Sequence, residues 1–192
     1  MKLVFATHND HKLKEVQQLL PDHIELLSLK DINCLEEIPE TGDTLEENAQ
    51  IKADYVTQTF GLDCFSDDTG LLVNALNGAP GVYSARYAGE QKNALDNMEK
   101  LLSELKGDTD RSAHFKTVVH LNLKGESYTF DGIVEGQITS EKHGKGGFGY
   151  DPIFKPNGYD HTFGELTSAV KNAISHRGRA IEKLVEFLKK RT

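Results

Sequence analysis

Residues 146–152 hold an unusual combination of side chains in this chain of 192 residues. Three glycines surround Phe148, Tyr150 and Asp151. Glycine adopts positive φ angles and lets the backbone approach a ligand closely, while Phe148 offers a stacking face and Asp151 a hydrogen-bond acceptor. The pattern is typical of a pocket for a flat, polar, ring-containing ligand. Taken alone, the segment also fits a glycine-rich hairpin whose aromatic rings bind nothing.

A second polar group follows the first apolar run, where Thr7, Asn9 and Lys12 lie in a loop that leads into a predicted helix. A helix N-terminus offers free amides and partial positive charge. The three side chains add a hydroxyl, an amide and an ammonium, so the loop could bind a polyphosphate. It lacks the glycine pattern of a P-loop. The alternative is that Thr7 or Asn9 only caps the helix and that Lys12 is solvated.

Asp67 and Asp68 are consecutive carboxylates at the end of a predicted short strand. Because side chains alternate along an extended strand, we expect the two to point to different places, one holding a hydrated Mg²⁺ or a water and the other supporting the loop. Glu40 could supply a further acidic group from a loop. The alternatives are an exposed Asp-Asp turn and, for Glu40, a solvated acidic face.

Cationic side chains gather near the C-terminus, where Lys171 precedes Ser175, His176 and Arg177. Arg177 stays charged and donates hydrogen bonds in a planar fork, so it could grip a phosphate or a carbonyl oxygen with defined geometry. The alternative is a helix that begins at a serine and carries exposed basic residues.

The elements that position these residues can be read from the apolar spacing. Residues 3–6 predict a buried strand, followed by an amphipathic helix with Leu13, Val16, Leu19 and Leu20 facing inward. A second helix is predicted from Thr44, which forms a capping-box pattern with Glu47. Residues 64–66 predict a short strand that leads into the two aspartates.

The second half of the chain predicts a turn at residues 78–81, a helix over residues 93–105 and a final helix through Ile181 and Leu188. Between the helices, β-type runs at 113–123, 127–130 and 133–138, broken by Gly125 and Gly132, predict an antiparallel meander. Helices and strands alternate without regular βαβ repetition, so we expect a mixed α/β sheet.

Composition limits the class of protein. No linker or repeat divides the chain, so we expect a single domain over residues 1–192. The formal net charge of −8 argues against a nucleic-acid partner. The N-terminal apolar run is short and soon becomes polar, and no long apolar segment follows, which argues against a signal peptide and a membrane span. We therefore expect a cytoplasmic protein. Cys34 and Cys64 are expected to be buried thiols.

With these motifs in view, nearly the whole chain resembles the inosine triphosphate pyrophosphatase family. The resemblance is strongest in the ordered set of motifs and in one run of ten residues, Gly-Ala-Pro-Gly-Val-Tyr-Ser-Ala-Arg-Tyr at 78–87. The other matching segments are Ala6-Thr7-x-Asn9-x-x-Lys12, Glu40-Thr41-Gly42, Glu46-Glu47-Asn48-Ala49, Ser66-Asp67-Asp68-Thr69-Gly70-Leu71, residues 146–154 and Lys171-Asn172-Ala173-Ile174-Ser175-His176-Arg177. Ile38-Pro39 stands before Glu40 where many relatives place another acid, and Ser66 stands where the bacterial motif often has alanine.

The resemblance implies an elongated mixed β-sheet flanked by helices, two lobes with a substrate cleft between them, and a homodimer. It also implies Mg²⁺-dependent hydrolysis of the purine nucleoside triphosphates ITP, dITP and XTP to the monophosphate and pyrophosphate. Asp68 is then the general base, and Glu40, Asp68 and Asp67 are the candidate metal ligands. The implied substrate-binding residues are Thr7, His8, Asn9, Asp10, His11, Lys12, Thr69, Phe148, Gly149, Tyr150, Asp151, Lys171, His176 and Arg177.

Within this set, Phe148 is expected to stack on the purine, and Arg177 or its neighbours to donate hydrogen bonds toward its 6-oxygen. Two other functions remain open. A phosphatase on the same scaffold would release orthophosphate instead of pyrophosphate, and a nucleotide sensor would bind without needing Asp68.

Overall fold

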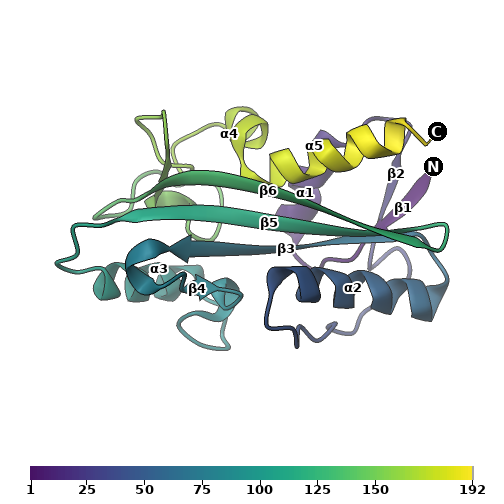
Figure 1. The fold of residues 1–192 in the computed structure, drawn as a ribbon, viewed down its shortest axis with the longest axis horizontal. Coiled ribbons are helices and arrows are strands. Elements are labelled where there is room, and N and C mark those ends of the chain that lie inside the picture. The colour runs from purple at the N-terminus through teal and green to yellow at the C-terminus, as the bar shows by residue number, and fades with distance from the viewer. Residues whose placement is uncertain (192) are drawn as a thin grey trace. The chain divides into compact units, whose positions relative to one another are not determined.

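The computed structural model of the protein describes residues 1–191. It contains one seven-stranded sheet of order β2-β1-β3-β5-β6-β7, with β4 paired to β3. The strand β1 is parallel to β2 and to β3, whereas β4 is antiparallel to β3 and β7 is antiparallel to β6, so the predicted mixed sheet is confirmed. The strands are β1 (Lys2–Phe5), β2 (Glu25–Ser28), β3 (Cys64–Val73), β4 (Pro80–Gly81), β5 (Ser112–Leu123), β6 (Glu126–Ile138) and β7 (Phe154–Pro156) (Figure 1).

The helices begin at residues whose side chains satisfy free backbone amides. Asn9, Thr44 and Asn93 act as N-caps, and Thr44 forms the predicted capping box with Glu47. The α-helices are α1 (Asp10–Leu19), α2 (Leu45–Phe60), α3 (Ala94–Glu104), α4 (Ser168–Ile174) and α5 (His176–Lys189), and the short 3₁₀ helices are Asn74–Leu76, Ser84–Arg86 and Asp151–Ile153.

The contacts divide the chain into two compact units. Unit 1 consists of Met1–Asp68, Thr117–Gly132 and the C-terminal segment from Arg177, and unit 2 consists of Thr69–Lys116 and Ile133–His176. The long strands β3, β5 and β6 contribute residues to both units. The cleft implied by the resemblance remains a prediction.

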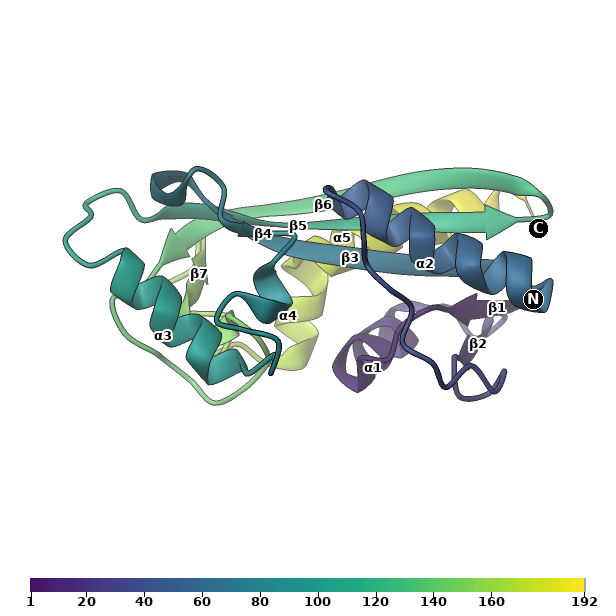
Figure 2. The ribbon, with the colours of Figure 1, turned by 90° about the horizontal axis from the view of Figure 1, so that it is seen from below.

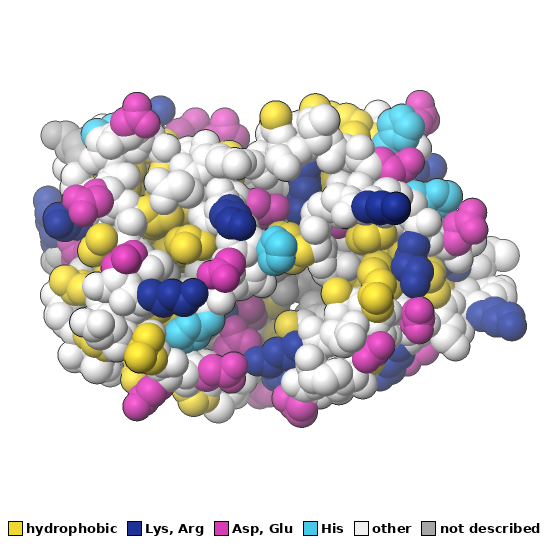
Figure 3. Space-filling view, turned by 180° about the vertical axis from the view of Figure 1, so that it is seen from behind, with side chains coloured by type: hydrophobic (Ala, Val, Ile, Leu, Met, Phe, Trp, Pro, Cys, Tyr) yellow, Lys and Arg dark blue, Asp and Glu magenta, His cyan; other side chains and the backbone are white. Residues whose placement is uncertain are grey.

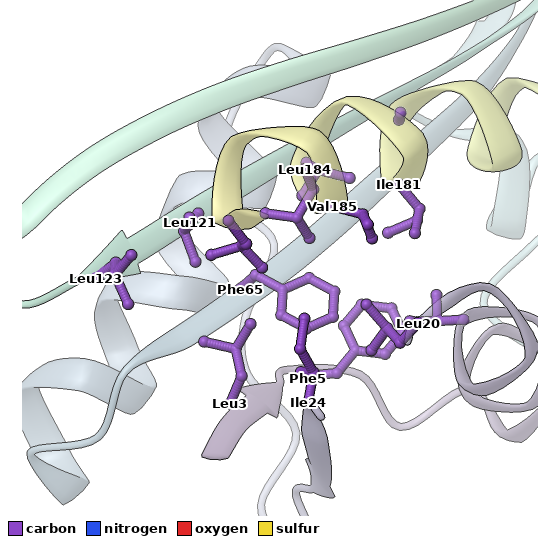
Figure 4. Close-up of a cluster of buried hydrophobic side chains, with 14 residues drawn as sticks. Leu3, Phe5, Leu20, Ile24, Phe65, Leu121, Leu123, Ile181, Leu184 and Val185 are labelled. Atoms are coloured by element: carbon purple, nitrogen blue, oxygen red, sulfur yellow. The ribbon is translucent and has the colours of Figure 1, made fainter. Parts of the chain in front are cut away.

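In unit 1, helices cover both faces of the sheet, with α2 on one face and α5 on the other (Figures 1 and 2). Alternation along β1 divides its side chains between the two layers. Leu3 and Phe5 join the cluster that contains residues of α1 and α5, whereas Val4 joins the cluster that contains Ala53 of α2. The Phe5 ring stacks on Phe65 of β3 at 4.6 Å between centroids (Figure 4).

Unit 2 has a core of its own, in which apolar side chains of α3 pack with β3, β5 and β6. The predicted inward residues Met98 and Leu101 of α3 are buried there, together with Phe154 and Phe163. Rings of Phe115 and Phe154 meet edge to face at 4.7 Å between centroids. This aromatic core supports the glycine-rich segment and α4.

The sequence-based boundaries were wrong at two strands. The predicted short strand 64–66 continues to Val73 as β3, so Asp67 and Asp68 lie inside a strand, not at its end. Gly132 does not interrupt the second half of the predicted meander, because β6 runs unbroken from Glu126 to Ile138. The hairpin turn is made by Lys124 and Gly125, both with positive φ, as a two-residue hairpin loop requires.

Strands β2 and β7 and helix α4 were not predicted, and β4 lies where only a turn was predicted. The four residues of β2 are partly exposed and too short for a clear apolar period. Helix α4 has only seven residues, and its buried positions include Lys171 and Asn172, so it has no apolar stripe.

No helix within residues 1–191 is long and apolar enough to cross a membrane. On the face drawn in Figure 3, Lys and Arg side chains are interspersed with Asp and Glu side chains. Cys34 and Cys64 are both buried and reduced, as expected.

Candidate active site

The loop before α1 is organised by its own side chains. The Asn9 side-chain oxygen accepts hydrogen bonds from the amides of His11 (2.9 Å) and Lys12 (3.2 Å), and the Thr7 hydroxyl oxygen accepts one from the Asn9 amide (3.1 Å). Asn9 therefore caps the helix, which is one of the alternatives that the sequence left open. The Thr7 hydroxyl keeps its own proton for donation to a ligand.

Lys12 does not extend into solvent, because its ammonium donates to Asp67 Oδ1 at 2.9 Å. The second oxygen of the same carboxylate, Oδ2, accepts from Arg177 Nε at 3.0 Å. Arg177 Nη1 in turn donates to Glu15 of α1. A line of alternating charges thus runs through Lys12, Asp67, Arg177 and Glu15. We call this line of four side chains the Glu15 chain.

The charges of the Glu15 chain set one another's protonation. Burial alone would raise the pKa of Asp67, but the positive charges of Lys12, Arg177 and Lys52 outweigh it and hold that pKa well below its usual range. Burial lowers the pKa of Lys12, with Asp67 opposing the shift. The pKa of Arg177 is raised, because Asp67 and Glu15 outweigh the effect of burial. Asp67 is therefore an ionised, fully buried counter-ion.

Asp68 points away from this group, as alternation along β3 predicts. Its Oδ1 lies 3.4 Å from Lys52 Nζ, and the same ammonium donates to Glu40 Oε1 at 2.5 Å. Lys52 was missed by the sequence analysis. It lies on the buried face of α2 with Ala49, Ala53 and Val56. A lysine at such a position is the signal that could have identified it.

Burial also shifts the pKa values of this second group. Burial raises the pKa of Asp68, with Lys52 and Lys12 opposing the shift. Burial alone would lower the pKa of Lys52, but Asp68, Glu40 and Asp67 outweigh it and raise that pKa. A carboxylate with a raised pKa is a stronger base than an ordinary aspartate, which suits Asp68 to accept a proton.

The carboxylates of Asp68 and Glu40 have the chemistry to hold Mg²⁺. Both contact the same Lys52 ammonium, whose single positive charge balances only one of the two carboxylates. Within residues 1–191, no three His, Cys, Asp or Glu side chains form a group that could hold a metal ion. Mg²⁺ is commonly held by one or two carboxylates together with substrate phosphates, so this donor set fits it. Asp67 fits less well, since Lys12 and Arg177 engage both of its oxygens.

In unit 2, the glycine-rich segment and α4 bring a second group together. Asp151 Oδ2 accepts hydrogen bonds from Lys171 Nζ and from the Phe148 amide, both at 2.7 Å. The Lys171 ammonium also lies 4.7 Å from the centre of the half-buried Phe148 ring. A Cβ atom on Gly147, whose φ is +71°, would come within 2.1 Å of Asp151 Oδ2, so this close approach requires glycine.

Two other predicted pocket residues are almost fully buried in unit 2. His176 stacks on Phe115 at 4.5 Å between ring centroids. Tyr150 donates its hydroxyl to the Ser84 carbonyl oxygen at 2.8 Å, which ties the glycine-rich segment to the run at 78–87. Because its hydroxyl is engaged and its ring is buried, Tyr150 could contact a ligand through its backbone groups but not through its side chain.

The structure also places the remaining predicted residues. His8 Nε2 is 2.8 Å from the Glu36 carbonyl oxygen, and the exposed Asp10 lies 3.6 Å from Lys30 Nζ. His11 is exposed, Thr69 is half-buried, and Gly149 has a φ of +62°. The predicted residues that hydrogen bonds or ion pairs between side chains bring together therefore fall into three contact groups: the Glu15 chain, the group around Lys52 and the group around Asp151.

Comparison with known proteins assigns the family. The Ham1 family model matches residues 3–187. The chain belongs to the Ham1 family. Within this family, it is 62% identical over 188 residues to a dITP/XTP pyrophosphatase of Flavobacterium johnsoniae, covering 98% of each chain. It is also 62% identical over 190 residues to a dITP/XTP pyrophosphatase of Christiangramia forsetii, covering 99% of this chain and 100% of the relative.

Solved Ham1 structures share the fold. The Staphylococcus aureus Ham1 protein superposes with a TM-score of 0.91 at 39% identity and covers all of both chains, and a HAM1 protein from Coxiella burnetii gives 0.92 at 41% identity over 99% of both. The resemblance inferred from the motifs and the mixed α/β fold are therefore confirmed. The roles of individual Ham1 site residues remain predictions.

Proposed function

We propose that this Ham1 protein hydrolyses non-standard purine nucleoside triphosphates, namely ITP, dITP and XTP, to the monophosphate and pyrophosphate. The relatives named dITP/XTP pyrophosphatases, at 62% identity over nearly the full chain, support the reaction. The observation that carries the proposal for this chain is the group formed by the buried Asp68 and Lys52 with the half-buried Glu40. It combines a carboxylate of raised pKa with a fixed ammonium, which hydrolysis of a phosphoanhydride can use.

In the mechanism that this geometry supports, Asp68 accepts the proton of the water that attacks the α-phosphorus. Lys52 holds the Asp68 carboxylate in place, and Lys12 and the Thr7 hydroxyl bind phosphate oxygens. Mg²⁺ held by Glu40 and Asp68 would neutralise phosphate charge. Pyrophosphate leaves without a covalent enzyme intermediate, because phosphoryl transfer depends mainly on alignment and charge neutralisation.

The unit 2 group supplies the proposed base pocket. Phe148 offers one ring face to the purine while Lys171 lies against the ring, and the Asp151–Lys171 pair fixes the glycine-rich segment. Hydrogen-bond donors directed at the 6-position of the purine pair with the carbonyl oxygen of ITP and XTP. They are left unpaired against the amino group of adenine, so the site favours ITP and XTP over ATP.

The finer expectations also belong to this proposal. We propose a homodimer, as the resemblance implies, in the cytoplasm and without a nucleic-acid partner. The net charge of −8 supports the last point. The match of the family model to residues 3–187 supports a single domain over residues 1–192.

One assay tests the reaction. The purified protein is given ITP, dITP, XTP and the four standard triphosphates, with and without Mg²⁺, and the products are identified. We expect pyrophosphate from the non-standard purines, little turnover of ATP, and loss of turnover without Mg²⁺. Release of orthophosphate would favour a phosphatase, and binding of ITP without any turnover would favour a sensor.

Phe148→Ala is expected to raise KM for ITP. Stacking of a base on an aromatic ring contributes about 1–3 kcal/mol, so the loss should be roughly 5- to 150-fold. Because the ring is only half-buried, thermal stability should change little. Steady-state kinetics and thermal melting check this, with Tyr159→Ala as an exposed aromatic control. An unchanged KM with a lowered melting temperature would assign Phe148 to the core instead.

A further inference from the structure

Glu15, the last residue of the Glu15 chain, was not among the predicted binding residues. Glu15 lies three residues after Lys12 on α1, so the two side chains share a helix face. Glu15 accepts a hydrogen bond from Arg177 at the start of α5, and Lys12 donates one to Asp67 of β3. The chain therefore connects three elements of unit 1.

The central members of this chain are almost completely buried. The side chain of Asp67 is 0% exposed, that of Arg177 is 2% exposed and that of Lys12 is 14% exposed. A buried guanidinium requires compensating negative charge. Arg177 obtains it from two carboxylates, Asp67 and Glu15.

Arg177 and Lys12 both contact the Asp67 carboxylate, so the charge of Glu15 on Arg177 affects how strongly Asp67 can bind Lys12. Asp67 shares its charge between Arg177 on Oδ2 and Lys12 on Oδ1. If Glu15 loses its charge, Arg177 depends more strongly on Asp67, and the carboxylate is drawn toward the guanidinium. The hydrogen bond that orients the Lys12 ammonium is then weakened.

We propose that Glu15 is a positioning residue for phosphate binding, acting through Arg177 and Asp67 on the Lys12 ammonium. Asp67 then serves as the support of Lys12 and not as a metal ligand, and Arg177 links Glu15 to that carboxylate. The inference rests on the proposed function in one respect, namely that Lys12 binds phosphate.

A double-mutant cycle tests it with Glu15→Gln, Lys12→Met and the double variant. Two quantities are measured: kcat/KM for ITP, and the Kd of inorganic pyrophosphate in metal-free buffer. We expect Glu15→Gln to weaken both by about tenfold, a coupling within the range for residues in one ion-pair network. The double variant should match Lys12→Met alone, because Glu15 acts only through Lys12. The ratio of ITP to ATP turnover should stay unchanged.

The control is Glu25→Gln, which removes a carboxylate from an exposed ion pair with Lys2 and should change neither quantity. Additive losses in the cycle, wild-type values for Glu15→Gln, or a changed ITP-to-ATP ratio would each overturn the proposal. If Glu15→Gln does not fold, the cycle is repeated with Glu15→Asp, and failure of both to fold would assign Glu15 to stability alone. A wild-type protein that turns over no ITP would refute the proposed function. The Kd values for pyrophosphate would in that case still test the role of Glu15.

Discussion

Asp68→Asn is expected to reduce kcat for ITP by about 10²- to 10⁴-fold, the range typical of a lost general base. The amide keeps the shape of the side chain but cannot accept the proton of the attacking water, and it binds a metal ion poorly. Glu40 remains beside Lys52 in this variant, so the ammonium keeps a carboxylate partner and the fold should survive. Nucleotide binding should be largely preserved.

Pyrophosphate release and equilibrium binding of ITP measure the two halves of this prediction. Asp131→Asn is the matched control, since Asp131 is an exposed carboxylate paired with Lys183 at 2.9 Å. Turnover of Asp68→Asn near the wild-type rate would remove Asp68 from the mechanism. A general loss of ITP binding would show that Asp68 acts on the substrate before the chemical step.

Lys52→Met should produce a large loss of stability together with a loss of activity. The ammonium compensates Asp68, whose side chain is 11% exposed, and Glu40, and its removal leaves a buried negative charge without this partner. Breaking a buried ion pair from one side typically costs about 3–5 kcal/mol. Because Glu40 is 33% exposed and can turn toward water, we expect a value at the lower end, about 3 kcal/mol.

Urea unfolding of three variants, compared with the wild-type protein, tests the reason for this loss. Adding Asp68→Asn to Lys52→Met removes the uncompensated charge, so the double variant should be more stable than Lys52→Met alone, although still inactive. Lys183→Met, which breaks the exposed pair with Asp131, should change the unfolding free energy by at most about 1 kcal/mol. If the double variant is no more stable than Lys52→Met, the lysine acts through packing of its aliphatic stem instead.

Local signals were sufficient for much of the fold. Helix α2 and its capping box follow from Thr44 and Glu47, and α3 follows from the spacing of its apolar residues, because caps and amphipathic periods depend on residues only a few positions apart. The family could also be inferred from the ordered motifs, since these are written directly in the chain. The short and partly polar β2 and α4 had no such period, and only pairing and packing with distant segments stabilises them.

For the candidate site, the sequence by itself determined the kinds of chemistry available: consecutive aspartates facing opposite sides of a strand, a lysine near a helix start, and a glycine-rich aromatic segment. Only the tertiary structure decided the partners. It joins Lys12 and Arg177 to Asp67, places Lys52 beside Asp68, and extends the network to Glu15. Asp67 and Arg177 are 110 residues apart in sequence. Burial of such charges favours the fold in which each meets an opposite charge, and that requirement depends on the whole packed unit rather than on any local pattern.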